Sequence, residues 1–485
     1  MNTYIGIDLG TSAAKFLLVD EDGKILSSVS EKYEVSYPRE GWSEQNPADW
    51  ISAVKRGVSA LLKGRNRGAV RGIGAGGQMH GLVALDGRGE VIRPCILWND
   101  GRTERQTEYL NNVVGKRKLS DCTANIAFAG FTAPKLLWLK ENEPENFEKI
   151  RKILLPKDYV NYFLTGGFNT DLSDASGTLL LDVKNRNWSG DMCRLTGISN
   201  DVLPELHESY EAIGKLRKEL CELWGLKDVT VCAGAGDNAA AAIGTGTVGG
   251  GSANISLGTS GTLFVSKSGF SVDEKNALHS FCHADGRFHL MGCILSAASC
   301  NSWWLNVLSS TDFDGEQRGL EKYLGENNVY FLPYLSGERS PHNDVNARGA
   351  FLGLSHTTSR GQMSLAVLEG VAFALNDCLE IARADGEKIS RSKICGGGAK
   401  SALWRRIIAN VCNLSLEVPA VEEGPAYGAA ILSMVASGAY KSVDEACAKL
   451  AHTKEIVEPE PELTKKYAER YDKFRRIYPA LKGIL

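Results

Sequence analysis

The stretch Ile5-Gly6-Ile7-Asp8-Leu9-Gly10-Thr11-Ser12 decides how the rest of the chain is interpreted. Apolar and β-branched residues before a glycine predict a strand that enters a tight turn. The backbone N–H groups of such a turn, together with the hydroxyls of Thr11 and Ser12, suit phosphate oxygens. Lys15 follows shortly afterwards and adds a positive charge. We therefore predict a phosphate-binding turn near the start of the chain.

The same pattern returns in the second half of the chain, as Ile255-Ser256-Leu257-Gly258-Thr259-Ser260. Thr11 and Thr259 are 248 residues apart, which is about half of the 485 residues. Two such turns half a chain apart predict two similar α/β domains that close on one nucleotide. The glycine-dense segment from Gly244 to Gly251 marks the expected boundary, so the domains should span residues 1–245 and 246–485.

Composition and charge exclude several classes of protein. The hydrophobic content of 43% and the charged content of 23% are ordinary for a globular protein, and the net charge of −3 gives no basic excess for nucleic acid. The sequence contains neither a recognisable signal peptide nor a long apolar run, so we expect neither secretion nor a membrane span. The cysteines are scattered and never form Cys-x-x-Cys, which favours reduced thiols in a cytoplasmic protein over a disulfide or zinc framework.

The residues around the first turn predict a three-stranded meander, with strands at Tyr4–Asp8, Lys15–Val19 and Ile25–Ser28. Asp22-Gly23 is a typical hairpin turn. An amphipathic helix should follow from Pro47 to about Leu62, because apolar residues recur there at helical spacing.

Two later segments also have a helical pattern. Gly424–Ala430 is rich in small residues and predicts a helix that packs very close to a neighbour. The Lys- and Glu-rich tail beyond Thr453 predicts a surface helix.

One string imitates a nucleotide motif. Gly72, Gly74 and Gly77 satisfy the spacing Gly-x-Gly-x-x-Gly, but the segment that follows, Leu82–Gly87, is typical of a strand and a turn. A dinucleotide site needs a helix that begins at the third glycine. The sequence therefore argues against NAD, and the absence of a Gly-x-x-x-x-Gly-Lys-Ser/Thr string argues against a Walker-type site.

Two acids stand at predicted strand-to-turn junctions, Asp8 and Asp237. Either could be a turn-capping aspartate. Phosphoryl transfer, however, needs one carboxylate to hold Mg²⁺ near the phosphates and another to take the proton of the acceptor hydroxyl. Asp8 lies next to the phosphate turn and fits the first role, whereas Asp237 fits the second.

Other residues could bind a nucleotide or a sugar, but each could also have a purely structural role. The glycines at 396–398, followed by Ala399, could let a flat ring approach the backbone, or could be an ordinary strand-to-helix corner. His80 could line a polar pocket or be a structural histidine. Trp98 is either a core residue or a wall on which a sugar stacks.

Longer strings resemble the FGGY family of carbohydrate kinases. The segment Gly130–Asn142 fits the first signature of that family. Gly349–Leu354, with Gln362-Met363 and Ala366–Glu369, fits the second. Shorter strings favour members that act on D-xylulose: Gly77–Gly81, Ile96–Arg102, Gly236–Asn238 and Pro333–Arg339.

The resemblance implies a duplicated actin-like fold, which is ribonuclease H-like, with ATP and Mg²⁺ in a cleft between the domains. It implies that Asp237 accepts the proton and that Met79, His80 and Asn238 line the ketose pocket. It further implies ATP contacts from residues of both halves: Asp8 (through the metal), Thr11, Ser12, Lys15, Gly258, Thr259, Ser260, Gly397, Gly398 and Ala399. Ala402 stands where some members have an asparagine, which leaves the adenine contact at that position open.

The expected reaction is the ATP-dependent phosphorylation of D-xylulose at its C5 hydroxyl. A kinase for another pentulose or a polyol is the nearest alternative, since few residues line the pocket. A more distant one is an actin-like ATPase without a sugar, against which the polar residues Gln78–His80 and Asp237-Asn238 argue. Family members are often dimers, so a homodimer is a further possibility.

Overall fold

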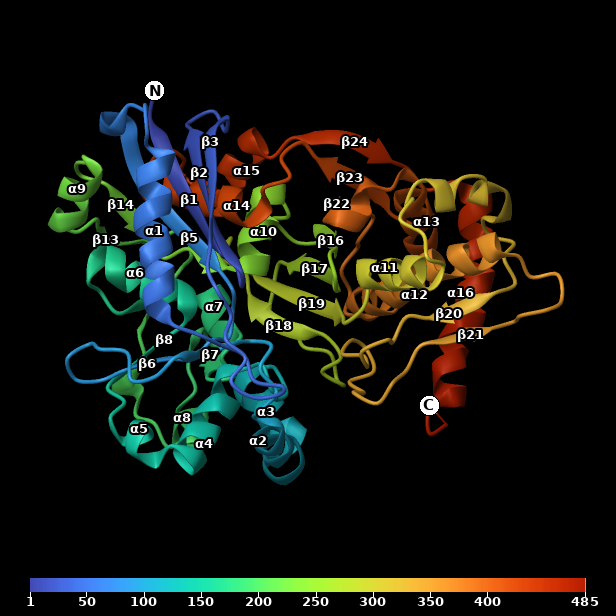
Figure 1. The fold of residues 1–485 in the computed structure, drawn as a ribbon, viewed down its shortest axis with the longest axis horizontal. Coiled ribbons are helices and arrows are strands. Elements are labelled where there is room, and N and C mark those ends of the chain that lie inside the picture. Colours follow the sequence, from blue (N-terminus) through green and yellow to red (C-terminus); the bar gives the residue numbers. More distant parts are fainter. Residues whose placement is uncertain (485) are drawn as a thin grey trace. The chain divides into compact units, whose positions relative to one another are not determined.

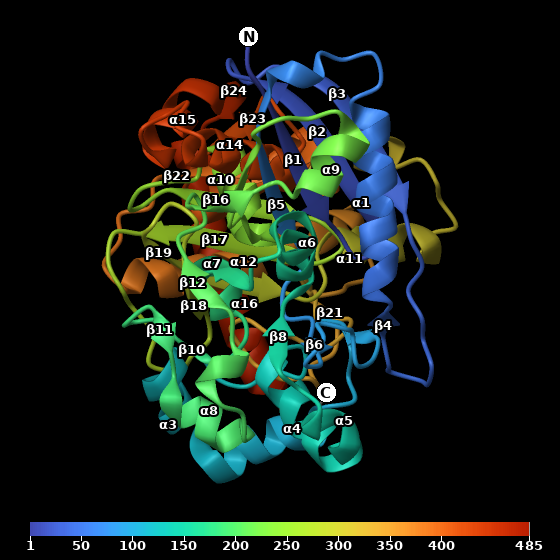
Figure 2. The same ribbon diagram turned by 90° about the vertical axis from the view of Figure 1, so that its left-hand side faces the viewer.

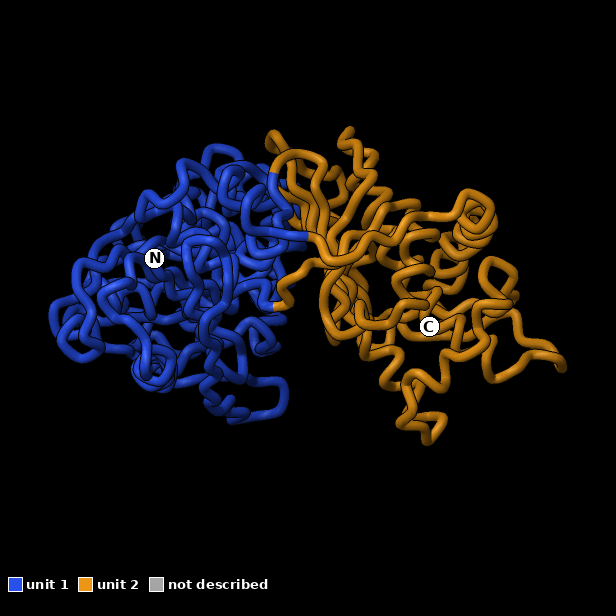
Figure 3. Tube along the Cα trace, turned by 90° about the horizontal axis from the view of Figure 1, so that it is seen from above, with its two compact units in different colours: residues 1–248, 280–288, 423–452 blue, residues 249–279, 289–422, 453–485 orange. Residues whose placement is uncertain are grey.

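The computed structural model describes residues 1–484, which fall into two compact units (Figure 3). Unit 1 combines Met1–Val248, Ser280–Phe288 and Glu423–His452. Unit 2 combines Gly249–His279 and His289–Glu422 with the chain from Thr453 onward. Each unit therefore contains segments that are far apart in the sequence.

The sheet of unit 1 has the strand order β13-β14-β5-β1-β2-β3, with β15 paired to β5. Its strands are β1 (Thr3–Leu9), β2 (Ala13–Asp20), β3 (Ile25–Lys32), β5 (Val70–Gly77), β13 (Ala212–Lys215), β14 (Thr230–Cys232) and β15 (Ala235–Gly236). β1, β2 and β3 form the predicted antiparallel meander, and Gly23 turns the second hairpin with a φ of 85°. β5 runs parallel to β1, and β14 and β15 run parallel to β5.

Helices cover both faces of this sheet. They are α1 (Pro47–Leu61), α6 (Pro156–Thr165), α10 (Asp237–Thr245) and α14 (Gly424–Ala436). α1 begins where the sequence predicted it, with Asn46 capping its first turn. Figures 1 and 2 show α1 and α14 on opposite sides of the strands. α14 packs on β1, β5 and α10.

The predicted close packing of the small-residue helix is confirmed. A Cβ atom at Gly6 of β1 would lie 1.9 Å from the main-chain oxygen of Ala426, and one at Gly74 of β5 would lie 2.1 Å from that of Ala429. The helix backbone therefore rests directly on the strands. No side chain larger than hydrogen fits at these two positions without a shift of the backbone.

The string Gly72-x-Gly74-x-x-Gly77 lies wholly inside strand β5. No helix begins at its third glycine, because residues 78–82 form a loop that leads to β6 (Val83–Leu85). The prediction that this string is not a dinucleotide motif is confirmed.

The sheet of unit 2 repeats the connectivity of the first. The order of its strands is β19-β17-β16-β22-β23-β24. The strands are β16 (Ala253–Leu257), β17 (Gly261–Lys267), β19 (Phe288–Ile294), β22 (Arg391–Cys395), β23 (Ser415–Pro419) and β24 (Thr453–Val457), whereas β18 (His279–Cys282) belongs almost wholly to unit 1. β22 runs parallel to β16, β23 runs parallel to β22, and β24 is antiparallel to β23. The same relations link β5, β14 and β13 in unit 1, so the predicted duplication is confirmed and the fold is actin-like.

The principal helices of unit 2 are α11 (Ala298–Val307), α12 (Arg360–Ala384), α13 (Ala402–Cys412) and α16 (Pro461–Leu481). A capping box of Ser359 and Gln362 begins α12. The sequence predicted only a surface helix beyond Thr453, and this was incomplete. The segment first adds edge strand β24, and α16 then buries Tyr467, Phe474 and Tyr478 in the core of the unit.

Short elements complete the chain. They are α2 (Glu104–Glu108), α3 (Lys116–Thr123), α4 (Thr132–Asn142), α5 (Pro144–Glu148), α7 (Leu172–Ser176), α8 (Gly190–Thr196), α9 (Lys218–Trp224), α15 (Val443–Leu450), β4 (Glu44–Gln45), β7 (Cys95–Ile96), β8 (Lys152–Leu154), β9 (Asn169–Asp171), β10 (Leu181–Asp182), β11 (Asn187–Trp188), β12 (Glu205–His207), β20 (Tyr330–Leu332) and β21 (Ala350–Leu352). Within residues 1–484, none of the helices has the length and apolar character that a membrane span requires.

Candidate functional site

The carboxyl ends of three parallel strands in unit 1 bring the predicted catalytic residues to one edge of the sheet. Asp8 of β1 is in register with Gly76 of β5, and Gly236 of β15 is in register with Gly77. The next residue after Gly236 is Asp237, the first residue of α10. The residues that follow β5 are Gln78, Met79 and His80. This edge is where open α/β sheets bind their ligands.

Asp8 and Asp237 lie close enough for their charges to interact. Burial raises the pKa of Asp8 to about 7, and the charge of Asp237 contributes to the rise, while Lys15 opposes it. Burial also raises the pKa of Asp237 to about 6. Both carboxyls therefore titrate near neutrality, which is where a general base is effective.

Asn238 stabilises the ionised form of Asp237. Oδ1 of Asp237 accepts a hydrogen bond of 2.7 Å from the backbone N–H of Asn238 and one of 2.9 Å from its Nδ2. These bonds partly offset the effect of burial on the pKa. They also orient the carboxylate at the start of α10.

Met79 packs against Gly236, the residue before Asp237, and His80 packs against Gly177. A Cβ atom at Gly236 would lie 2.9 to 3.1 Å from the side chain of Met79. A Cβ atom at Gly177 would lie 2.4 Å from Cε1 of His80. Nδ1 of His80 donates a hydrogen bond of 2.7 Å to the carbonyl oxygen of Gly177. Unit 1 thus brings together four of the predicted substrate residues, Met79, His80, Asp237 and Asn238.

The fifth predicted substrate residue, Trp98, lies beside the first phosphate turn. Its indole is 43% exposed, and Nε1 donates a hydrogen bond of 3.0 Å to Oγ1 of Thr11. The main-chain oxygen of Thr11 accepts a further bond of 2.6 Å from Nε2 of Gln45. An exposed aromatic face next to a fixed turn suits stacking on a sugar or a base.

The first turn has both a cation and an open cavity. Lys15 forms an ion pair with Glu423, which the sequence analysis did not single out. A cavity of about 580 Å³ lies beside the turn. It is lined by Ser12, Ala13, Lys32, Tyr33 and Glu34.

The second turn, Gly258–Ser260, lies between β16 and β17 of unit 2. The carbonyl oxygens of Gly258 and Thr259 accept hydrogen bonds of 2.9 Å from the backbone N–H groups of Ala298 and Ala297. The start of α11 therefore fixes the shape of this turn.

The glycines at 396–398 follow β22, which is parallel to β16 and pairs Cys395 with Ser256. The glycine segment and the second turn therefore leave the same edge of the sheet of unit 2. A cavity of about 480 Å³ opens there. Its lining is Ile394, Cys395, Gly396, Gly397, Ala399, Lys400, Arg405, Val418, Pro419, Val421, Glu422, Lys454 and Glu455.

The predicted nucleotide residues differ in how they relate to this cavity. Gly397 and Ala399 line it, whereas Gly398 is buried against the ring of Trp404. Ser401 caps α13 by accepting a hydrogen bond of 3.1 Å from the N–H of Trp404. Ala402, the first residue of α13, is exposed.

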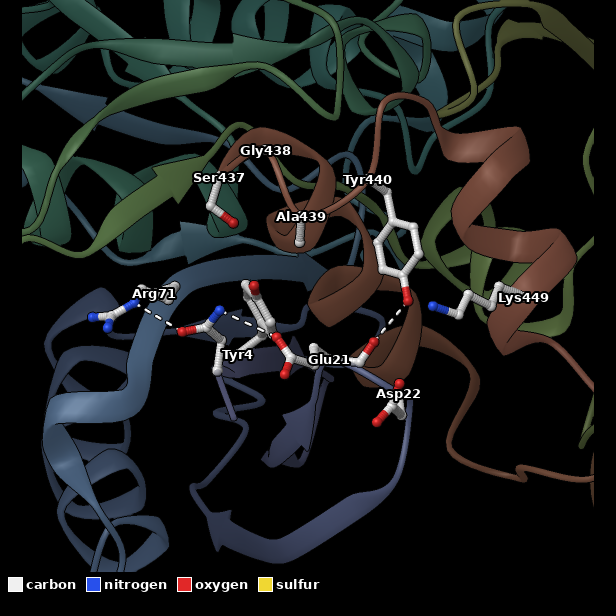
Figure 4. A pocket seen from close by; sticks show the side chains of 10 residues that line it. Tyr4, Glu21, Asp22, Arg71, Ser437, Gly438, Ala439, Tyr440 and Lys449 are labelled. Atoms are coloured by element: carbon white, nitrogen blue, oxygen red, sulfur yellow. Dashed lines mark hydrogen bonds between the residues drawn. The ribbon is translucent and has the colours of Figure 1, made fainter.

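A further cavity of about 360 Å³ lies at the opposite end of β1 and contains none of the predicted site residues (Figure 4). Its polar side chains are bonded to one another. Asn2 links Arg71 to Glu21, and the hydroxyl of Tyr440 donates to the main-chain oxygen of Glu21. We therefore place the candidate site at the other end of the strand.

The donor set around Asp8 fits a magnesium ion. Mg²⁺ prefers one or two carboxylates together with phosphate oxygens and water. Asp8 is a half-buried carboxylate beside the first phosphate turn, and burial disfavours its charge unless a cation is near.

Lys135 lies inside the family signature Gly130–Asn142, but no separate role was predicted for it. It is completely buried in α4, and its ammonium group contacts the main-chain oxygen of His80 at 2.8 Å. A lysine within the otherwise apolar run Ala133–Leu139 was the available signal.

The duplicated actin-like fold, with two carboxylates at one edge of its first sheet, is compatible with phosphoryl transfer. Comparison with known families agrees. The N-terminal domain model of the FGGY family of carbohydrate kinases matches residues 3–244, and its C-terminal domain model matches residues 253–437. The chain belongs to the FGGY family of carbohydrate kinases and is a sugar kinase.

Similar proteins match over the whole chain. The xylulose kinase of Escherichia coli K12 is 42% identical over 485 residues, which cover 99% of this chain and 100% of that protein. The crystal structure of a xyloylose kinase from Brucella ovis is 42% identical, with a TM-score of 0.95 and 100% of both chains covered. A gluconate kinase from Lactobacillus acidophilus has the same TM-score of 0.95 at 26% identity, covering 99% of this chain and 98% of its own.

Proposed function

We propose that this protein transfers the γ-phosphoryl group of ATP to the C5 hydroxyl of D-xylulose, giving D-xylulose 5-phosphate and ADP. Membership of the family implies ATP as the phosphoryl donor. The full-length similarity to xylulose kinases supports D-xylulose as the acceptor.

The observation that carries the proposal is the position of Asp237, a partly buried carboxylate with a pKa of about 6 that directly follows Gly236, the glycine packed against Met79, and whose charge acts on Asp8. In the reaction, Asp237 takes the proton of the C5 hydroxyl as the C5 oxygen bonds to the γ-phosphorus. The bond between that phosphorus and the bridging oxygen of ADP breaks, and ADP leaves with the electron pair. A positioned base typically contributes about 10²–10⁴-fold to such a step.

The ketose binds to the polar side chains around Asp237 in this proposal. Asn238 and His80 offer hydrogen bonds to the sugar hydroxyls, Met79 supplies an apolar surface, and Trp98 closes the site beside the phosphate turn. The contacts of these residues within unit 1 support their assignment.

Two groups of residues bind ATP in this proposal. Thr11, Ser12 and Lys15 serve the phosphates from unit 1. The residues of unit 2 that bind ATP are Gly258, Thr259, Ser260, Gly397, Gly398 and Ala399. Asp8 holds Mg²⁺, which would neutralise charge on the phosphates when it is bound.

We also propose functional domains at residues 1–245 and 246–485, a cytoplasmic location and a homodimer. The two family models, which meet between residues 244 and 253, support the boundary. The free state of all twelve cysteines supports a reducing compartment. Light scattering on the purified protein tests the homodimer.

The release of ADP over a panel of acceptors tests the function. The panel contains D-xylulose, D-ribulose, L-xylulose, glycerol and gluconate. We expect D-xylulose to give the highest kcat/KM. A clear preference for another acceptor would refute the substrate, and the gluconate kinase with the same fold makes that a specific alternative.

The variant Asp237→Ala tests the role of the base. We expect a loss of about 10²–10⁴-fold in kcat with unchanged binding of ADP. Near-normal turnover in this variant would refute the assignment.

A further inference from the structure

His80 has an unusual backbone conformation. Its φ is 69°, a left-handed value that few residues other than glycine adopt. The N–H of Gly81 donates a hydrogen bond of 2.9 Å to the main-chain oxygen of Met79. A hydrogen bond across one residue with positive φ defines the rarer and more strained kind of γ-turn. Strained backbone of this kind persists only where the surrounding structure holds it.

The start of helix α4 supplies that hold. The main-chain oxygen of His80 accepts a hydrogen bond of 2.8 Å from Nζ of Lys135 and one of 3.0 Å from Oγ1 of Thr132. Thr132 and Lys135 are three residues apart, so they lie on the same face of the helix. Both side chains are completely buried.

Lys135 differs from the other completely buried lysine of unit 1, Lys157. Lys157 forms ion pairs with Asp158 and Asp171. In residues 1–484, by contrast, no ion pair involves Lys135, and its two hydrogen bonds reach the main-chain oxygens of His80 and Gly130. A buried ammonium without a carboxylate is costly. Its two hydrogen bonds join the His80 turn to Gly130, just before α4.

The same turn sets the chemistry of the imidazole. A carbonyl oxygen only accepts hydrogen bonds, so the 2.7 Å contact with Gly177 requires the hydrogen on Nδ1 of His80. In a neutral imidazole with this tautomer, Nε2 is the acceptor nitrogen. The ring of Phe131, just before α4, packs against the imidazole, with 4.7 Å between the two ring centroids. The Gly177 contact and the Phe131 ring thus hold the imidazole from two sides.

We propose that Lys135, with Thr132, is a positioning residue that fixes ketose affinity: it holds the His80 turn in the conformation in which the imidazole binds a hydroxyl of the substrate. This inference rests on the proposed function, since it deepens the same site. Neither residue touches the reacting atoms.

The test compares Lys135→Met with Lys140→Met, an exposed lysine on the same helix. We expect Lys135→Met to raise the KM for D-xylulose about tenfold or more, as is usual for a lost hydrogen bond from a charged group. The KM for ATP should stay within about twofold, and kcat should fall less than the KM for D-xylulose rises. Calorimetric binding of D-xylulose without ATP should weaken in parallel.

Thr132→Val is the second variant, because it removes one hydrogen bond and keeps the shape of the side chain. It should raise the KM for D-xylulose by a smaller factor. If both variants fold and leave that KM unchanged, the inference is wrong.

A double-mutant cycle shows whether Lys135 acts through His80. Asparagine tolerates positive φ, so His80→Asn removes the imidazole while the turn can persist. We expect Lys135→Met to add little to the KM in this background. Fully additive effects would overturn the inference.

Turnover by the unaltered protein separates the two proposals. If it uses D-xylulose and the variants behave normally, only the positioning role fails. If it prefers another acceptor of the panel, the proposed substrate fails, and the same variants are then compared on that acceptor.

Discussion

Two carboxyls, Asp8 and Asp237, give the site its dependence on pH. Ordinary aspartates are ionised far below neutrality, but here burial raises both pKa values, to about 7 and about 6. The site works only when both carboxyls are ionised, so kcat/KM for D-xylulose should rise with pH and level off above about 8. At pH 5 it should be at least about tenfold below the plateau. A flat profile between pH 5 and pH 7 would contradict the assignment.

A substitution next to the base provides the control for this pH profile. Asn238 donates two hydrogen bonds to Asp237 and thereby lowers its pKa. Asn238→Ala removes the bond from the side chain, so the acidic limb of the profile should move to higher pH. The position of the limb is measured separately from the maximum rate, which also changes if the substrate contact is lost.

Some of these residues could be predicted from local sequence and others could not. Asp8 and Asp237 each lie in or just after a strand pattern and within two residues of a glycine, so the local sequence predicts their position at a strand-to-turn junction. Lys135 lies in an apolar helix, and its role depends on His80, which is 55 residues away in the chain. Glu423 likewise meets Lys15 only through the fold.

At the scale of elements, the contact of α14 with β1 and β5 is unusually close. Gly6→Ala would place a Cβ atom against the main chain of Ala426. We expect a loss of about 1–3 kcal/mol in stability, seen as a fall of several degrees in Tm. Gly87→Ala is the matched control, because its Cβ atom would have no neighbour nearer than 3.8 Å. Equal Tm values for the two variants would contradict this view of the packing.

Local sequence patterns predict some of these elements and miss others. The periodicity of Pro47–Leu61 and the small residues of Gly424–Ala436 identify helices, because each pattern is local. β24 was missed because its residues are mostly exposed and its evidence is the pairing with β23. The sequence cannot reveal such a partner.

At the scale of the whole molecule, the two sheets repeat one connectivity, but the acids do not repeat. Ser256 stands in the second copy where Asp8 stands in the first. The duplicated turns were predictable from the repeated string, whereas the assignment of residues 423–452 to unit 1 was not. That assignment follows from contacts of α14 with strands more than 340 residues earlier in the chain.

This arrangement predicts the behaviour of a fragment. Residues 1–248 alone lack α14, so the glycine-lined faces of β1 and β5 and the apolar side of α10 would be open to water. We expect the isolated fragment to aggregate or to lack a cooperative melting transition. A soluble fragment with a sharp transition would show that α14 is dispensable.

The late position of α14 in the sequence also affects folding during synthesis. A ribosome adds about 5–20 residues per second, so about 10 to 40 s separate residue 248 from the end of α14. During that interval the sheet of unit 1 lacks helix α14, while most of unit 2 is synthesised. The nascent protein must therefore stay unaggregated through its own synthesis, and slow translation between the two units would prolong its exposure to chaperones and proteases.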